Sequence, residues 1–183
     1  MTKEECPQKN ILLTGPPRIG KTTAAMAIAS TLGSDAGGFY TDEIRERGKR
    51  KGFRITSLDG DSGILAHVDI KGGPRVGRYG VNVSEVERVG IEAIRRAVRS
   101  GKVVVVDEIG AMELLSKPFK LTILEALDSA CPVIATIRQT WDPFTDSIKS
   151  RADVSLITLT IDNRDTVSRE AVETLRKYLY CST

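Results

Sequence analysis

The hydrophobic positions of this chain form short apolar runs that alternate with stretches in which apolar residues recur at helical spacing. The runs predict buried strands at Lys9–Thr14, Val103–Asp107 and Pro132–Ile137, and further strands at Gly38–Ile44 and Val154–Ile161. The helical spacing predicts helices over about Gly20–Leu32, Ser84–Gly101, Ser116–Ala130, Asp142–Ser150 and Arg164–Tyr180. Strands that alternate with helices in this order predict an α/β fold with a doubly wound, mostly parallel sheet.

The segment between Gly48 and Gly80 breaks this alternation. Phe53–Leu58 and Ile64–Ile70 alternate apolar and polar residues, a pattern typical of half-exposed antiparallel strands. Lys71–Gly80 contains four glycines and one proline, which indicates a loop. We interpret residues 48–80 as a β-hairpin insertion at the edge of a single domain that spans residues 1–183.

Two predicted helices begin with recognisable capping residues. Ser84 and Glu87 have the spacing of a capping box, in which each side chain bonds to the backbone of the other residue. Ser116 precedes Pro118, so we expect it to cap the following helix with proline in the first turn.

A glycine-rich segment between the first strand and the first helix fits the motif G-x-x-x-x-G-K-[ST] in full. Its residues are Gly15, Pro16, Pro17, Arg18, Ile19, Gly20, Lys21 and Thr22, and Thr23 follows. The glycines allow backbone N–H groups to surround phosphate oxygens, and the helix N-terminus adds a favourable dipole. We expect Lys21 to contact the β- and γ-phosphates and the Thr22 hydroxyl to bind Mg²⁺. A chance match in a turn is the alternative, and the flanking strand and helix argue against it.

A second candidate element is the apolar strand that ends in Asp107 and Glu108. We expect Asp107 to hold Mg²⁺, directly or through water. Glu108 is a candidate to polarise the attacking water, which favours hydrolysis over nucleotide sensing. The alternative is two solvated acids at the end of a strand.

Three further residues are candidate phosphate sensors. Thr136 and Arg138 follow the next strand, and ligands of open α/β sheets lie at the carboxyl ends of strands. Arg151 lies in a polar segment that could close over the phosphates and stabilise charge in the transition state. For both arginines a surface ion pair is the alternative interpretation.

A basic cluster lies in the insertion, where a nucleic acid or a phosphate-bearing substrate is one candidate partner. Its members are Arg45, Arg47, Lys49, Arg50, Lys51 and Arg54, interleaved with Glu46. The alternative is the solvated tip of a hairpin. Only Tyr40 and Phe53 lie nearby as aromatic residues, which is little for stacking single-stranded RNA.

The composition excludes several classes of protein to which the chain could belong. Of 183 residues, 40% are hydrophobic and 28% charged, with a net charge of +3, as in an ordinary globular protein. The longest apolar run, Val103–Val106, is far shorter than the ~20 residues that cross a bilayer. Three widely spaced cysteines and the single histidine, His67, form neither a disulfide framework nor a metal site. With a polar N-terminus, these features predict a cytoplasmic protein without membrane contact.

Several motifs together resemble those of the small P-loop nucleoside-triphosphatase family, which has thermophilic prokaryotic and human members. The motifs are N-I-L-L-T-G-P-P-R-I-G-K-T-T at 10–23, G-F-Y-T-D-E-I-R at 38–45, V-D-E-I-G at 106–110, M-E-L at 112–114 and N-R-D at 163–165. The resemblance implies a RecA-like fold and Mg²⁺-dependent hydrolysis of ATP, GTP, CTP and UTP to nucleoside diphosphate and phosphate. It identifies Glu108 with the water-activating position, and it places nucleotide contacts on the phosphate loop and on Val103, Val104, Val105, Val106, Asp107, Glu108, Ile109 and Gly110.

The chain departs from this family at two positions, because Arg18 stands where glycine is usual and Ala111 where lysine is usual. Asn163 and Arg164 follow the last strand, where we expect a loose contact with the base. The alternative is that Asn163 only caps the last helix.

Two other functions remain open from the sequence. A nucleotide or nucleoside kinase uses the same phosphate loop but transfers the phosphoryl group to an acceptor. A non-catalytic or slow NTP-dependent RNA- or partner-binding module is the second alternative, and the basic cluster suggests it. A monomer is favoured over an oligomer.

Overall fold

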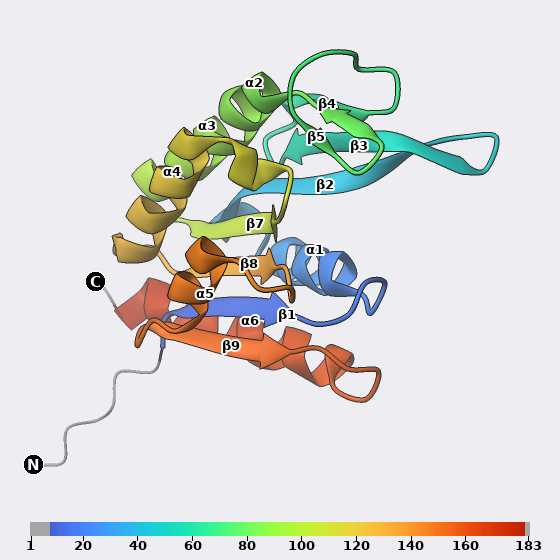
Figure 1. The fold of residues 1–183 in the computed structure, drawn as a ribbon. Coiled ribbons are helices and arrows are strands. Elements are labelled where there is room, and N and C mark those ends of the chain that lie inside the picture. The colour runs from blue at the N-terminus through green and yellow to red at the C-terminus, as the bar shows by residue number, and fades with distance from the viewer. Residues whose placement is uncertain (1–7, 182–183) are drawn as a thin grey trace, which may run out of the picture.

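The computed structural model describes residues 8–181, which form one sheet with helices on both faces (Figure 1). The strands are β1 (Asn10–Thr14), β2 (Ala36–Glu46), β3 (Lys49–Ser57), β4 (Ser62–His67), β5 (Arg75–Val76), β6 (Tyr79–Val81), β7 (Val103–Ile109), β8 (Val133–Ile137) and β9 (Val154–Thr158). Across the described part of the sheet their order is β5-β6-β4-β3-β2-β7-β8-β1-β9.

The helices join these strands. They are α1 (Lys21–Leu32), α2 (Val83–Glu85), α3 (Glu92–Arg99), α4 (Lys117–Asp128), α5 (Pro143–Lys149) and α6 (Arg164–Cys181). Two short 3₁₀ helices, η1 (Gly33–Asp35) and η3 (Glu113–Leu115), and one π-helical segment, η2 (Val86–Ile91), complete the elements. Within the described residues no helix is both long and apolar enough to span a membrane.

Half of the sheet is parallel, and the predicted doubly wound fold is confirmed. β2, β7, β8, β1 and β9 all run in one direction, with Val105 opposite Ile134 and Leu12 opposite Ala135. The carboxyl ends of these strands therefore lie at one edge of the sheet. The strand order changes direction next to β1, which is where open α/β sheets bind ligands.

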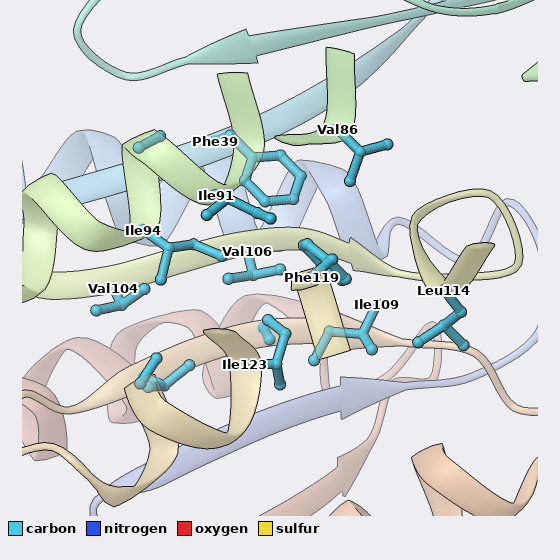
Figure 2. Packing of buried hydrophobic residues seen from close by; sticks show 14 of the residues in the cluster. Phe39, Val86, Ile91, Ile94, Val104, Val106, Ile109, Leu114, Phe119 and Ile123 are labelled. Atoms are coloured by element: carbon cyan, nitrogen blue, oxygen red, sulfur yellow. The ribbon is translucent and has the colours of Figure 1, made fainter. Parts of the chain in front are cut away.

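The apolar strands are covered on both faces. Val104 and Val106 pack with residues of α3 and α4 (Figure 2), whereas Val103 and Val105 pack with residues of α1 and α6. Successive side chains of a strand point to opposite faces, so a strand between two helical layers must be apolar throughout. The uninterrupted valines of β7 meet this requirement.

The other half of the sheet is antiparallel and larger than the predicted hairpin. β3 and β4 pair as expected, but the predicted loop at 71–80 contains β5 and most of β6. The glycine-rich composition was misleading because Gly77, at φ +57°, makes a tight turn between these strands. Tyr79 then packs edge-on against Phe53, with ring centroids 5.3 Å apart.

One of the two predicted caps is present and the other is not. The Ser116 hydroxyl accepts a hydrogen bond from the Phe119 N–H at 3.1 Å, which confirms the cap of α4. The Ser84–Glu87 capping box is wrong. Ser84 donates to the Asn82 side chain at 2.6 Å, and the Glu87 carboxylate accepts from the Ser116 hydroxyl at 3.0 Å. The Glu87 carboxylate thus bonds to the residue that caps α4 and not to the backbone at the start of its own helix.

Only part of the prediction about the cysteines falls on described residues. Cys131 is a buried free cysteine, whereas Cys6 and most of the polar N-terminal segment lie outside the described residues.

The packing of α4 gives a direct test of the core. Ile123 is 1% exposed and lies in the cluster of Figure 2. Ile123→Ala should lower the free energy of unfolding by about 2–5 kcal/mol, because the variant loses apolar burial and leaves a cavity. Leu121 in the same helix is 61% exposed, so Leu121→Ala should change this free energy by less than about 0.5 kcal/mol. Urea denaturation measures both, and equal effects would contradict the packing described.

Candidate functional site

The glycine-rich loop joins β1 to α1 at the carboxyl edge of the sheet (Figure 1). Gly15 has φ +144° and Gly20 has φ +106°, so neither position suits a residue with a side chain. A Cβ on Gly15 would also lie 3.0 Å from the backbone oxygen of Leu159. The loop is therefore packed directly against the segment that follows β9.

The second half of the loop carries the backbone N–H groups that can donate to an anion. Pro16 and Pro17 have no backbone N–H, so the amides available to an anion begin at Arg18. Gly20 precedes α1 without any side-chain cap, which leaves the positive end of the helix dipole facing the loop. The Lys21 ammonium donates to the backbone oxygens of Gly15 at 3.0 Å and Pro16 at 3.2 Å, so its charge lies within the loop.

Arg18 occupies an unusual conformation at the exposed tip of the loop. Its φ is +66°, in the left-handed region that favours glycine. The sequence departure at this position thus coincides with a backbone geometry for which glycine is the less strained choice.

Asp107 connects three elements at the end of β7. The Thr136 hydroxyl of β8 donates to Asp107 Oδ1 at 2.6 Å, and the Thr22 hydroxyl of α1 donates to the same oxygen at 3.2 Å. Asp107 is 1% exposed, and its other oxygen, Oδ2, is buried without a hydrogen-bond partner among the described residues. Burial raises the pKa of Asp107, and the bonds from Thr136 and Thr22 oppose that rise.

These oxygen atoms fit a hard divalent cation. The Asp107 carboxylate, whose Oδ2 has no partner among the described residues, and the Thr22 hydroxyl beside it suit an ion that prefers oxygen ligands. Within residues 8–181 no cluster of three or more His, Cys, Asp or Glu side chains could hold a metal. A cation here would complete its coordination with phosphate oxygens and water.

Glu108 lies beside the same charges. The pairing of β7 with β8 shifts register between Val106 and Ile109, so the regular alternation of side chains is interrupted at the two acids. Burial raises the pKa of Glu108, the Lys21 charge lowers it, the Asp107 charge raises it and the Arg138 charge lowers it. Lys21, Asp107, Glu108 and Arg138 are thus electrostatic neighbours.

The candidate sensors separate into two groups. Thr136 bonds to Asp107, and Arg138 is half-buried near Glu108, where its Nε also donates to the Thr140 hydroxyl at 2.7 Å. Arg151 lies instead just before β9, at the opposite edge of the sheet. There it pairs with Asp128 at 2.6 Å and Asp153 at 2.8 Å, which is the surface ion pair that the sequence left open.

Asn163 organises the turn beside the phosphate loop. Its side-chain oxygen accepts from the Thr160 N–H at 2.8 Å, and its amide donates to the Thr158 oxygen at 3.0 Å. These bonds shape the turn before α6 and do not cap the helix. Arg164 is exposed next to this turn.

The basic cluster lies on the hairpin of β2 and β3, and two of its arginines already have anionic partners. Arg45 and Arg50 both pair with Glu43, at 2.5 and 2.7 Å. Arg50 also stacks on Phe53 and Tyr79, with its guanidinium 5.2 and 5.9 Å from the ring centroids.

Sequence reasoning missed one residue of the site, Glu113 in η3. It is 4% exposed, and burial raises its pKa to about 8. The signals in the sequence were its place in the M-E-L motif at 112–114 and its position shortly after the acidic end of β7.

Comparisons with known proteins show which family the chain resembles. Residues 10–172 match the family model described as NTPase. The chain is 46% identical to the nucleoside-triphosphatase THEP1 of Thermotoga petrophila, covering 91% of this chain and 92% of that protein. It is 50% identical to the protein of the same name from Thermofilum pendens, covering 86% and 90%.

Two solved structures share the fold. The crystal structure of THEP1 from the hyperthermophile Aquifex aeolicus superposes with a TM-score of 0.84 at 36% identity, covering 91% of this chain and 98% of that one. The solution structure of a human cancer-related nucleoside triphosphatase gives 0.79 at 32% identity, covering 92% and 97%.

The backbone at Arg18 gives a prediction about stability. Arg18→Gly should be more stable than Arg18→Ala by about 1 kcal/mol, because glycine relieves the left-handed strain at some cost in unfolded-state entropy. Both variants lose the guanidinium, so the comparison isolates the backbone. Chemical denaturation measures the difference, and an alanine variant as stable as the glycine variant would contradict the left-handed geometry.

Proposed function

The chain belongs to the NTPase family, and we propose that it is a Mg²⁺-dependent nucleoside-triphosphatase that hydrolyses ATP, GTP, CTP and UTP. The proposal is carried by one arrangement, the convergence of Lys21, Thr22 and Asp107 at the end of the phosphate loop. This arrangement supports binding of a triphosphate at its β- and γ-phosphates, with a cation beside them.

Thr22 and Asp107 are the proposed ligands of Mg²⁺. The unpartnered Asp107 Oδ2 supports this role, as does the Thr22 hydroxyl 3.2 Å from Oδ1. When bound, Mg²⁺ neutralises charge on the β- and γ-phosphates. Thr136 holds the Asp107 carboxylate in position through its 2.6 Å hydrogen bond.

Glu108 is the proposed general base. Its carboxylate takes a proton from the attacking water while the water oxygen bonds to the γ-phosphorus. The bond from the γ-phosphorus to the β–γ bridging oxygen breaks, and its electron pair stays on the nucleoside diphosphate. A partly buried carboxylate with a raised pKa suits proton acceptance better than a fully solvated one. Arg138 is the proposed sensor of the γ-phosphate, and its charge, which lowers the pKa of Glu108, supports this role.

Loose base selectivity is the expected property of the turn beside Asn163 and Arg164. The Asn163 side chain is occupied by bonds within the turn. The exposed Arg164, which pairs with Asp165 at 4.0 Å, is proposed to stack on a base, a contact that reads the ring face and not the hydrogen-bonding pattern.

The first test is phosphate release from the four common nucleoside triphosphates without any acceptor. We expect all four to be hydrolysed with Mg²⁺ and none without it. Lys21→Ala should remove most activity while the protein stays folded, because the charge on the β- and γ-phosphates is lost. A thousandfold preference for one base would contradict the loose pocket, and full activity in folded Lys21→Ala would contradict the loop assignment. Strict dependence on an added acceptor would favour the kinase alternative.

A second test separates the two acids of β7. Glu108→Gln should lower kcat by ~10²–10⁴, because general-base help of that size is lost while the nucleotide contacts remain. Asp107→Asn should also raise the Mg²⁺ concentration needed for half-maximal activity. Steady-state phosphate release paired with nucleotide titration measures both. An unchanged kcat in Glu108→Gln would move the water-activating role to another residue.

A further inference from the structure

Glu113 is held rigidly behind the proposed site. It begins η3. The Leu114 N–H donates to the backbone oxygen of Gly110 at 3.1 Å, and the Ser116 N–H donates to the backbone oxygen of Glu113 at 3.0 Å. The neighbouring Leu114 is anchored in the apolar cluster (Figure 2). The Glu113 side chain is 4% exposed and is therefore buried next to this anchor.

The Glu113 and Glu108 carboxyl groups both lie next to Gly110. A Cβ on Gly110 would lie 3.0 Å from Glu113 Oε2 and 3.2 Å from Glu108 Cδ. Its φ lies outside the positive range in which glycine is needed for conformation. Glycine therefore leaves space here, because a side chain would crowd both carboxyl groups.

The charged groups that act on Glu113 are all negative. Besides burial, the charges of Glu108 and Asp107 raise its pKa, whereas the N–H groups of Glu113 and Gly110 lower it, and the result is about 8. The cations of the site, Lys21 and Arg138, act on Glu108. Glu113 is therefore mostly protonated at neutral pH, and a protonated carboxyl can donate a hydrogen bond.

We propose that Glu113 is a positioning residue, a neutral carboxylic acid that holds the Glu108 carboxylate in place for water activation. The inference rests on the proposed role of Glu108. When Glu113 loses its proton, a third carboxylate repels Glu108, Asp107 and the γ-phosphate. Hydrolysis therefore declines as the pH rises through the ionisation of Glu113.

The test is the pH dependence of kcat and KM from about pH 6 to 10 in wild type, Glu113→Gln, Glu113→Ala and Gly110→Ala. Glutamine is neutral and can still donate, so Glu113→Gln should keep kcat at pH 7 within about threefold and lose the alkaline decline. Glu113→Ala should lose ~10–100-fold in kcat with KM little changed, because Glu108 is no longer oriented. Gly110→Ala should reproduce that loss, since it crowds the carboxyl groups while keeping both.

Glu92→Gln is the matched control. Glu92 is a half-exposed acid of α3 that pairs with Arg95 at 3.4 Å, far from the reaction, so its variant should follow the wild-type profile. An alkaline decline that persists unchanged in Glu113→Gln, or an unchanged kcat in folded Glu113→Ala, would overturn the proposal. An unchanged kcat in Glu108→Gln would instead overturn the assignment of the base, so the two failures are distinguishable.

A measurement without substrate tests the protonation itself. Between about pH 4.5 and 8 the unfolded chain releases the Glu113 proton and the folded protein keeps it, so folding stability falls as the pH rises through this window. Glu113→Gln lacks this loss. The urea midpoint of Glu113→Gln should rise relative to that of the wild type between pH 5 and 9. A constant difference between the two midpoints would overturn the proposal that Glu113 is a neutral acid.

Discussion

The burial of Asp107 is the constraint on which the site depends. An acid that is 1% exposed can lie at the end of an apolar strand only if its oxygens are satisfied. Thr136 and Thr22 satisfy one oxygen and thereby fix β8 and the start of α1 relative to β7. The other oxygen is buried without a hydrogen-bond partner among the described residues, which leaves it available to a cation. The Asp107 carboxylate thus both joins three elements of the fold and supplies a candidate ligand for a metal ion.

The charges around Asp107 explain why the site would recruit cations. Burial raises the pKa of Asp107, Glu108 and Glu113 alike, which means that the folded protein resists accumulating three negative charges there. Lys21 relieves part of this unfavourable charge, and a bound metal ion would relieve more. Affinity for the metal and the basicity of Glu108 are therefore coupled through the same low-dielectric environment.

Local signals explain how much could be predicted from the sequence. The apolar run of β7 and the loop at Gly15–Thr22 can each be recognised from a few neighbouring residues, and the parallel sheet follows from their order. Contacts between residues far apart in the sequence cannot be recognised in this way. Glu87 bonds to Ser116, 29 residues away, and Arg151 to Asp128, so their local surroundings gave no indication of either contact. The strands at 75–81 were hidden by glycines that serve turns, and Glu113 is buried next to Leu114, which lies in the core.

The fate of the water oxygen tests the central claim most directly, namely that this edge of the sheet transfers the γ-phosphoryl group to water. Hydrolysis of a nucleoside triphosphate in oxygen-18-labelled water, followed by mass spectrometry of both products, shows which phosphorus is attacked. The account predicts one labelled oxygen in inorganic phosphate and none in the nucleoside diphosphate. Label in the diphosphate, or phosphate released without label, would contradict it.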